Sequence, residues 1–433
     1  MPSPDPSPAA QRQAARRIAA RRAATGSAPL LVTDPTNVRY LTGFTGDSTV
    51  LLLWTEGRKR RALLVSDGRF ETQLAEQCPG LDAVIRPPTV TMPQAIAEQI
   101  AVIGQTFAVE PAVMTLETFG KINGELAGLY GDDDGQGGGN GSNEDGSNED
   151  GSSEEVRNKK SKPQTITAAQ LNEAVSAASK SGRGGIWQGD ADTVSIAKLR
   201  QIKDDSEIAA IRRAVATSER VFDYMRARLQ PELSEFDLAA DGEHVARQFG
   251  MTGWSFAAIV AAGDRAALPH YEPGDATVAG ESHVLIDWGV REPGGYVSDM
   301  TRVLMRAQTP KKIESIYRAV HAAHDAAVAA IRPGTKASEV DQVARDVLAE
   351  AGYGKRFTHS LGHGIGLNVH EGPGLRPGSD DELAAGMVVT VEPGVYLPAY
   401  GGVRLENDVL VTEDGCESIS TCDSLAIVAS PGS

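Results

Sequence analysis

Apolar and polar positions follow two different periods along the first third of the chain. Residues 30–54 hold two apolar runs around a polar stretch, which predicts a strand, a turn and a second strand, and residues 61–70 contain a third strand. Helical spacing of apolar residues predicts helices over 71–78 and 90–104, and an apolar run at 106–111 returns to strand. This alternation of strands and helices predicts a small α/β domain.

The apolar pattern stops after residue 130. Residues 131–155 contain no apolar side chain, and the pentapeptide GSNED occurs twice in tandem. Such a segment cannot bury enough apolar surface to offset the entropy of ordering, so a disordered acidic Gly/Ser-rich loop is predicted near 131–163. Calcium binding by its acids is the alternative, but the spacing of an EF-hand loop is missing.

A long amphipathic pattern begins near residue 193 and predicts the helical entry to a second domain. A chain of 433 residues exceeds the size of one ordinary core, so two domains are expected, over 1–192 and 193–433. An Ala/Arg-rich first helix is predicted around residues 12–22. A transit peptide is the alternative there, but it would need more serine.

Charge and cysteine content exclude several classes of protein. The net charge is −16, and nine acids without any Lys or Arg lie in residues 132–155, so the remainder carries −7. This balance argues against nucleic acid or an anionic membrane surface as a partner. No apolar run approaches the ~18 residues of a membrane-spanning helix. A cytoplasmic protein is expected, because the cysteines are few and form no CxxC pair: Cys78, Cys416 and Cys422.

All eight histidines lie at or after His244, so histidine chemistry is expected in the second domain. Residues 358–374, "THSLGHGIGLNVHEGPG", hold three of them with five glycines. His359 and His363 have the spacing of a helical zinc motif, but Ser360 stands where that motif has Glu. Each glycine would also cost about 1 kcal/mol in a helix interior, so a zinc helix is disfavoured. A phosphate-binding loop would need a Lys, and the segment contains none.

Four carboxylates in the second half of the chain stand in strand-like, otherwise apolar sequence. Asp287 and Asp299 flank a turn at 293–295, and a hairpin there would bring the two side by side. Glu392 and Glu406 occupy two further strands. Because a buried carboxylate is costly without a partner, these four side chains call for compensating cations.

Basic side chains or metal ions could supply that charge. Only Arg302 and Arg404 lie close in sequence to these acids. Two arginines are too few for four carboxylates, so ion pairs with Arg are a weak explanation of the whole set. Four carboxylates with one or two imidazoles form an oxygen-rich set that suits a pair of divalent ions such as Mn²⁺. A di-metal centre lowers the pKa of a bridging water, which is hydrolytic chemistry.

The segments "DWG…DMTR", "HSLGHGIGLNVHE", "VEPGVY" and "RLENDVLVT" resemble, in this order, the motifs of the pita-bread metallopeptidases. The likeness covers roughly 193–428 and is to the aminopeptidase P and Xaa-Pro dipeptidase (prolidase) branch. Residues 30–48, "LLVTDPTNVRYLTGFTGDS", resemble the creatinase-type N-terminal domain. The resemblance implies an α/β (α+β) fold class, with a creatinase-type N-terminal α/β domain before a C-terminal pita-bread metallopeptidase domain.

The resemblance also implies the site residues. It gives five metal ligands for two divalent ions, with Mn²⁺ preferred and Co²⁺ or Zn²⁺ as alternatives: Asp287, Asp299, His363, Glu392 and Glu406. It gives three catalytic residues: Glu392 as general acid/base, His270 and His370. It gives four substrate-binding residues: His270, His359, His370 and Arg404. Loop-capping roles are the alternative for His359 and His370, and four histidines match no motif: His244, His283, His321 and His324.

The implied activity is hydrolysis of the N-terminal Xaa-Pro bond of peptides, with a metal-bridged hydroxide as nucleophile. An aminopeptidase is preferred, and a prolidase restricted to dipeptides is the alternative. A non-catalytic pita-bread binding protein would be expected to have lost ligands, yet all five are present. The expected partners are peptides with proline in second position and a second copy of the chain, as a homodimer.

Overall fold

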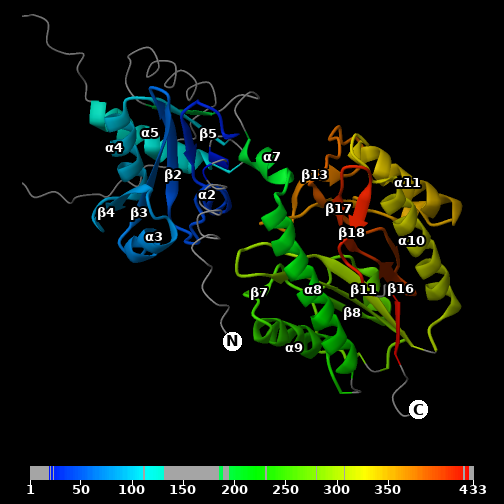
Figure 1. The fold of residues 1–433 in the computed structure, drawn as a ribbon. Helices are drawn as coiled ribbons and strands as arrows, with labels where there is room; N and C mark the ends of the chain where they lie inside the picture. The colour runs from blue at the N-terminus through cyan, green and yellow to red at the C-terminus, as the bar shows by residue number, and fades with distance from the viewer. Residues whose placement is uncertain are drawn as a thin grey trace, which may run out of the picture. The chain divides into compact units, whose positions relative to one another are not determined.

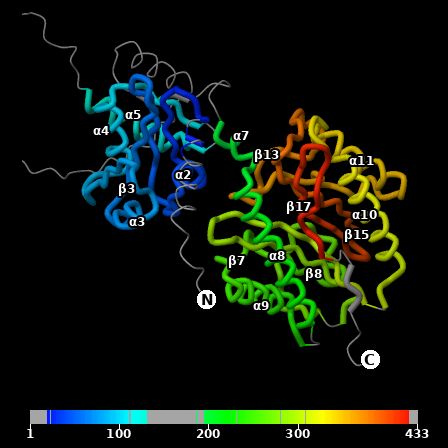
Figure 2. Tube along the Cα trace, viewed as in Figure 1, coloured from blue at the N-terminus to red at the C-terminus, as the bar shows by residue number. Residues whose placement is uncertain are grey.

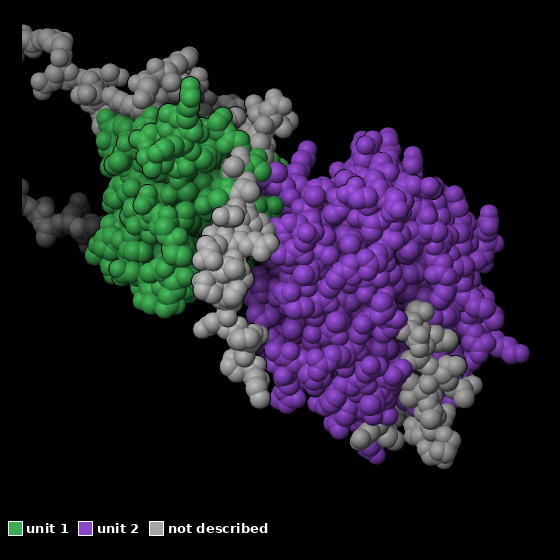
Figure 3. All heavy atoms as spheres, in the orientation of Figure 1, with its two compact units in different colours: residues 1–195 green, residues 196–433 purple. Residues whose placement is uncertain are grey.

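The computed structural model describes residues 19, 21–22, 24–110, 113–130, 185–188, 195–229, 232–278, 280–306, 308–422 and 425–428. The chain divides into two compact units, residues 1–195 and 196–433, which are green and purple in Figure 3. The acidic loop predicted near 131–163 and most of the predicted first helix lie outside the described residues. Among the described residues, no helix is long and apolar enough to cross a membrane.

Unit 1 contains a six-stranded sheet in the order β4-β3-β2-β1-β5-β6. The first three strands along the chain form an antiparallel meander, whereas β4, β5 and β6 join the sheet in parallel. Its strands are β1 (Leu30–Val32), β2 (Val50–Glu56), β3 (Lys59–Asp67), β4 (Asp82–Arg86), β5 (Thr106–Val109) and β6 (Gly185–Gln188). The alternating strands and helices predicted for this region are therefore present.

Helices α4 (Met92–Ile103) and α5 (Leu116–Tyr130) pack together and against this sheet (Figure 1). Their apolar faces meet strand residues in one buried core that includes Leu52, Ile96, Phe107, Phe119 and Ile122. Helix α3 (Glu71–Gln77) lies where the helical spacing predicted it. The core of unit 1 therefore forms without any contribution from the candidate site residues.

The turn predicted between the first two strands is wrong, because a helix stands there. Helix α2 (Pro35–Thr42) begins at Asp34, whose side chain accepts a hydrogen bond from the Asn37 backbone N–H. Pro35 occupies the first turn, where its missing N–H costs nothing. Gly43 ends the helix at φ 82°, a left-handed conformation that favours glycine. These start and stop signals were present in the sequence.

The single amphipathic helix expected from residue 193 is two helices, α7 (Ile196–Gln201) and α8 (Asp205–Ala227). Asp204 adopts an extended backbone and caps α8, with Glu207 completing a capping box. The Lys203 N–H donates instead to the Gly386 carbonyl, 2.9 Å away. The residues between α7 and α8 therefore form a backbone hydrogen bond with the loop that contains Gly386, which is distant in sequence.

Unit 2 contains two larger sheets, in the orders β19-β11-β9-β8 and β13-β12-β14-β17-β18, with the small pairs β10-β7 and β15-β16. Its strands are β7 (Gly253–Trp254), β8 (Ile259–Ala262), β9 (His283–Trp288), β10 (Val290–Arg291), β11 (Met300–Arg306), β12 (Gly362–Gly364), β13 (Glu371–Leu375), β14 (Val388–Val391), β15 (Gly394–Leu397), β16 (Gly401–Arg404), β17 (Asn407–Val411), β18 (Cys416–Ser418) and β19 (Leu425–Val428). Two 3₁₀ turns interrupt these elements, η1 (Gly263–Ala267) and η2 (Gly354–Arg356).

Two pairs of helices cover these sheets and create separate cores. Helices α8 and α9 (Glu235–Gln248) pack on β8, β9 and β11, where Phe222 stacks on Trp288 with ring centroids 5.2 Å apart. Helices α10 (Lys311–Ala330) and α11 (Ala337–Glu350) pack on the later strands (Figure 1). The late strands β15 and β16, orange to red in Figure 2, lie beside α10. The polar site described below lies among elements fixed by both cores.

Candidate metal centre

A cavity of about 540 Å³ lies within unit 2, and every candidate site residue from the sequence borders it. Its wall also contains apolar and aromatic side chains, among them Phe256, Ala258, Ile259, Pro269, Tyr271, Pro273 and Val369. The candidate residues span positions 270 to 406 in the chain, so the fold brings them together.

Strands β9 and β11 form the antiparallel hairpin that the turn at 293–295 predicted, and it brings Asp287 and Asp299 to the same cavity. Its register pairs Asp287 with Thr301, and Asp299 directly precedes β11, which begins at Met300. A Cβ atom added at Gly289 would lie 1.8 Å from the Ser298 carbonyl oxygen. The hairpin can therefore close tightly only because position 289 has no side chain.

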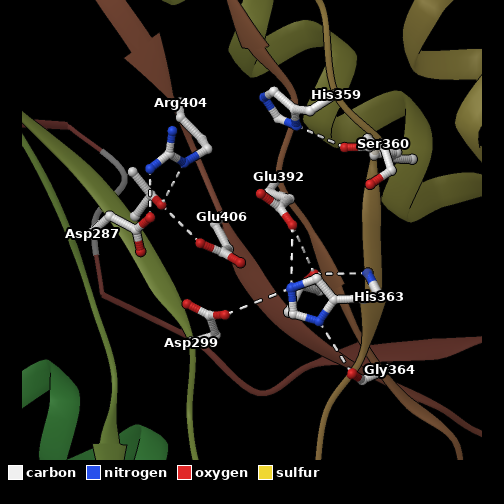
Figure 4. Close-up of polar contacts among 12 residues, drawn as sticks. Asp287, Asp299, His359, Ser360, His363, Gly364, Glu392, Arg404 and Glu406 are labelled. Atoms are coloured by element: carbon white, nitrogen blue, oxygen red, sulfur yellow. Dashed lines mark hydrogen bonds and ion pairs between the residues drawn. The ribbon is translucent and has the colours of Figure 1, made fainter. Parts of the chain in front are cut away.

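His363 comes from the middle of β12. Its Nε2 lies 3.7 Å from Asp299 Oδ2 and 3.4 Å from Glu392 Oε1, and both carboxylates point toward the ring (Figure 4). Its Nδ1 lies 3.1 Å from the Gly364 carbonyl oxygen. A proton on Nδ1 would satisfy that carbonyl and leave the Nε2 lone pair facing the carboxylates, as a metal-binding histidine requires. Burial lowers the pKa of His363 to about 4, which keeps the ring neutral.

Two glycines let the backbone approach closely around His363. A Cβ atom at Gly362 would lie 2.0 Å from the Thr390 carbonyl oxygen, and one at Gly364 would lie 2.0 Å from the Gly372 carbonyl oxygen. Neighbouring strands occupy the space that side chains would need. The abundance of glycine in residues 358–374 thus has a steric cause.

Glu392 and Glu406 reach the cavity from loops that follow β14 and β16. The Glu392 N–H donates to the Leu361 carbonyl at 2.8 Å, and the Glu406 N–H donates to the Thr301 carbonyl at 3.2 Å. The Thr301 hydroxyl donates to Glu406 Oε2 at 2.7 Å. Backbone contacts thus tie each carboxylate to a segment beside another candidate residue, because Leu361 directly precedes β12, which carries His363, and Thr301 lies two residues after Asp299.

Ligand atoms of Asp299, His363 and Glu406 all lie within 4.8 Å of one another. Burial and the charges of Glu406 and Asp287 raise the pKa of Asp299 well above its ordinary value. Burial, followed by the charges of Glu392 and Asp287, likewise raises the pKa of Glu406. Burial raises the pKa of Glu392 to about 8, with Asp287 adding to the rise. The cluster therefore has more negative charge than its surroundings compensate.

The residues present fit divalent cations. Among the described Lys and Arg side chains, Arg404 alone forms an ion pair with any of the four carboxylates, through Asp287 Oδ2. The other oxygen, Asp287 Oδ1, is buried without a hydrogen-bond partner. Arg302, the second cation considered from the sequence, donates to the Thr301, Glu406 and Cys422 carbonyls and to the Asn407 side chain. An oxygen-rich set with an orphaned carboxylate oxygen is suited to hard or borderline divalent ions.

Tyr396 links two of the predicted substrate contacts and was missed in the sequence. Its hydroxyl lies 2.8 Å from His359 Nε2 and accepts a hydrogen bond from Arg404 Nη1 at 2.8 Å. Arg404 also donates from Nε to the Thr301 hydroxyl at 3.1 Å. The position of Tyr396, four residues after Glu392 in "VEPGVY", was the signal that could have identified it.

The three candidate substrate histidines differ in their surroundings. His370 lies against His363, with ring centroids 4.4 Å apart and planes at 70°. His359 is held between the Ser360 carbonyl and Tyr396, and burial together with the charge of Arg404 lowers its pKa to about 4. His270 is exposed at the cavity wall.

The four histidines that match no motif lie away from this cavity. His283 is fully buried at the start of β9, where its Nδ1 lies 3.0 Å from the Ser282 hydroxyl. His244 contacts Gln248, and both His321 and His324 contact Asp325.

Comparison with known proteins assigns the family. Residues 209–413 match the family model of metallopeptidase family M24, and residues 15–131 match that of the creatinase/prolidase N-terminal domain. The chain therefore contains a metallopeptidase family M24 domain, preceded by a creatinase/prolidase N-terminal domain. The expected order, a creatinase-type N-terminal domain before a pita-bread domain, is confirmed.

Two bacterial relatives match about half of the chain. An uncharacterized peptidase of Staphylococcus saprophyticus is 41% identical over 232 residues, which are 54% of this chain and 66% of that protein. An uncharacterized peptidase of Staphylococcus aureus is 38% identical over 232 residues, again 54% of this chain and 66% of that protein. The match thus spans 66% of the length of these relatives.

Solved structures match nearly the whole chain. An Xaa-Pro dipeptidase from Bacillus anthracis is 29% identical, with a TM-score of 0.75 over 96% of this chain and 99% of that one. An X-Pro aminopeptidase from Thermotoga maritima is 26% identical, with a TM-score of 0.73 over 94% of this chain and 100% of that one. The chain thus resembles solved proline-directed enzymes of both kinds.

Proposed function

We propose that the chain is a metal-dependent exopeptidase that hydrolyses the N-terminal Xaa-Pro bond of peptides. One observation carries this proposal: four carboxylates and His363 converge on one cavity, and Arg404 is the single described arginine paired with any of them. Structural similarity to an Xaa-Pro dipeptidase and an X-Pro aminopeptidase supports the choice of proline.

We propose five residues as the ligands of two divalent ions, with Mn²⁺ preferred: Asp287, Asp299, His363, Glu392 and Glu406. When bound, such ions lower the pKa of a water molecule and polarise a substrate carbonyl. The same carboxylates would attract the free α-amine of a peptide, which explains a preference for the first bond.

The protein side chains would move the protons. Glu392 would accept a proton from the attacking water and return it to the leaving nitrogen. His370, beside His363, would donate to the oxyanion as charge develops there, and donors of this kind typically contribute several kcal/mol. An N-terminal Xaa-Pro bond needs such help because the proline nitrogen carries no hydrogen and cannot be held through an N–H.

The proline ring would occupy the part of the cavity bordered by His270, His359 and Arg404. His359 is neutral, and Tyr396 and the Ser360 carbonyl fix its ring, so it presents a defined surface. Pro269 and Phe256 add apolar wall to the same cavity. A cavity with fixed and apolar walls suits a ring that offers no hydrogen-bond donor.

A dipeptidase acting only on Xaa-Pro is the second candidate, because a solved relative with that specificity is 29% identical over nearly the whole chain. The two activities differ in whether the site accepts a substrate that continues beyond proline. We propose the aminopeptidase as the first candidate and the dipeptidase as the second. A homodimer and a cytoplasmic location remain predictions.

The test uses the full chain, stripped with chelator and reloaded separately with Mn²⁺, Co²⁺ or Zn²⁺. Ala-Pro-Ala, Ala-Pro and Met-Ala-Ser are the substrates, and we expect alanine release from Ala-Pro-Ala with Mn²⁺. Cleavage of Ala-Pro alone would favour the dipeptidase. Metal-loaded protein that releases no residue before proline would contradict both.

Matched carboxylate variants separate the site from general charge effects. Asp299→Asn should abolish release of alanine. Glu417→Gln should leave it unchanged, because Glu417 pairs with Arg212 at the surface and its side chain is 48% exposed.

A further inference from the structure

An ion pair on α11 contacts the segment that carries His359. The Asp341 carboxylate accepts two hydrogen bonds from Arg345, from Nε at 2.6 Å and from Nη2 at 3.0 Å. The Asp341 side chain is 1% exposed and that of Arg345 is 23% exposed. Both belong to the same helix, one turn apart, yet neither side chain borders the metal cavity.

The pair binds the backbone of residues 357–361 much as a neighbouring strand would. Arg345 Nη2 donates to the His359 carbonyl at 2.7 Å, and Nη1 donates to the Phe357 carbonyl at 3.4 Å. Asp341 Oδ1 accepts from the Leu361 N–H at 3.0 Å. The Arg345 guanidinium and the Asp341 carboxylate thus bind the backbone of Phe357, His359 and Leu361, which are alternate residues of one segment. These hydrogen bonds fix the position of residues 357–361 along α11.

The contact continues into the imidazole ring. The Arg345 guanidinium lies 4.4 Å from the centroid of the Phe357 ring, within the range of a cation–π interaction. The Phe357 ring meets His359 edge-on, with centroids 5.0 Å apart and planes at 86°. On its other side, His359 Nε2 lies 2.8 Å from the Tyr396 hydroxyl. The ring is therefore set by Phe357 on one side and Tyr396 on the other.

The same segment reaches one candidate ligand. The Leu361 carbonyl accepts from the Glu392 N–H at 2.8 Å, and the Leu361 N–H also faces the Leu375 carbonyl at 2.9 Å. A displacement of residues 357–361 would consequently move His359 most, since strand contacts at Leu361 hold the far end.

We propose that Asp341 and Arg345 are positioning residues that set selectivity for the proline ring by holding His359 in place. This inference rests on the proposed function, in which His359 borders the leaving proline. Neither residue would touch the substrate. Their effect on selectivity passes through the Phe357–His359 contact and the His359 carbonyl.

A purely structural ion pair would lower stability without changing which substrate is preferred. The test therefore measures a ratio, kcat/KM for Ala-Pro-Ala over kcat/KM for Ala-Sar-Ala, where Sar is N-methylglycine. Both bonds are tertiary amides, so the ratio isolates the ring contact from the chemistry of a missing N–H. The Mn²⁺-loaded full chain is used throughout.

Arg345→Met should lower this ratio about tenfold, because a misplacement of about 1 Å in a binding wall costs up to two orders of magnitude. Asp346→Asn is the matched control, since Asp346 lies on the same helix at an exposed site, where its carboxylate accepts a hydrogen bond from Gln342. The control should keep the wild-type ratio. Should Arg345→Met fail to fold, Arg345→Lys keeps the charge beside Asp341 but loses the forked donor geometry, and it should lower the ratio as well.

The decisive measurement repeats Arg345→Met in a His359→Ala background. If the ion pair acts through His359, the second substitution adds less than about twofold to the loss of selectivity. Independent, multiplicative losses would overturn the proposal, as would an unchanged ratio in folded Arg345→Lys protein. Failure of the proposed function is distinguishable, because the wild-type chain would then cleave neither peptide.

Discussion

Asp299 is a carboxylate whose surroundings oppose its charge. It is buried and stands among four other acids, Glu406, Asp287, Glu392 and Asp408, and its pKa is raised for both reasons. Without a cation, the ionised form is unfavourable at neutral pH, so the metal-free fold must either protonate Asp299 or bear the repulsion, and metal binding would relieve either cost.

Asp299→Asn should therefore stabilise the metal-free chain while abolishing the stabilisation by Mn²⁺. We expect the melting temperature of the metal-free variant to exceed that of the wild type by about 2–4 °C, the shift that roughly 1 kcal/mol produces in a domain of this size. Differential scanning calorimetry with and without Mn²⁺ measures both effects. A lower melting temperature in chelator would contradict the repulsion argument.

His283 makes a separate prediction about acid stability. Burial lowers its pKa to about 4, below the value near 6.5 of an unfolded chain. Between these two pH values His283 binds a proton in the unfolded state but not in the folded state. The free energy of unfolding therefore decreases as pH falls from about 6.5 to about 4. A shift of this size corresponds to about 3 kcal/mol as an upper bound.

His283→Gln removes the titrating imidazole. The free energy of unfolding should therefore fall less steeply between pH 6.5 and 4 than it does in the wild type. Urea unfolding at several pH values measures the slope, with His321→Gln as control, because the His321 side chain is 43% exposed. Equal slopes in wild type and His283→Gln would exclude the assignment.

Sequence reasoning found residues whose chemistry is conspicuous and missed those that act through contacts. The carboxylates in apolar strands were identifiable because burial of a charge is costly. Asp341 and Arg345 were not, since an Asp and an Arg four residues apart on a helix usually form a solvated surface pair. Burial of Asp341 by residues 357–361 is a tertiary fact that no local pattern contains.

At the scale of elements, the β9–β11 hairpin depends on Gly289. A Cβ there would collide with the Ser298 carbonyl oxygen at 1.8 Å, and backbone cannot move away as a flexible side chain would. Gly289→Ala should open the hairpin, destabilise unit 2 by more than about 2 kcal/mol and weaken Mn²⁺ binding. Calorimetry and metal titration measure the two effects.

Gly124→Ala is the control, because Gly124 lies inside α5 and a Cβ there would meet nothing within 4 Å. It should stabilise the protein by up to about 1 kcal/mol through helix propensity. Equal effects of the two substitutions would contradict the steric argument.

Elements with strong local signals were predictable, and those that depend on tertiary contacts were less so. The helix over residues 90–104 was expected because its apolar spacing is regular, and α4 spans Met92–Ile103. The break between α7 and α8 was not expected, because helical spacing continues across it. A capping box starts α8 at Asp205, and the Lys203 N–H donates to the Gly386 carbonyl and not to a carbonyl of α7, so the helix is interrupted between Gln201 and Asp205.

At the scale of the whole molecule, the candidate ligands join elements of two sheets in unit 2. Asp287 and Asp299 belong to the β9–β11 side, whereas His363 and Glu392 belong to the β12–β14 side. Bound metal would cross-link the two sheets, and a ligand that binds only the folded state stabilises it by mass action.

Mn²⁺ at about 100 times its Kd should therefore raise the stability of unit 2 by about 2.7 kcal/mol, and chelator should reverse the effect. Unit 1 has a core of its own and should not respond. Hydrogen exchange with and without Mn²⁺ compares the two units directly. Equal protection of both units would contradict a site confined to unit 2.

The order of the candidate ligands along the chain has a consequence for synthesis. Asp287 and Asp299 meet within one hairpin, but Glu406 is attached through the Thr301 carbonyl and hydroxyl, across more than a hundred residues of intervening chain. A growing polypeptide therefore exposes the aspartate pair long before the cluster can close. The full set of candidate ligands therefore closes only after β17, which directly follows Glu406, has paired with β14.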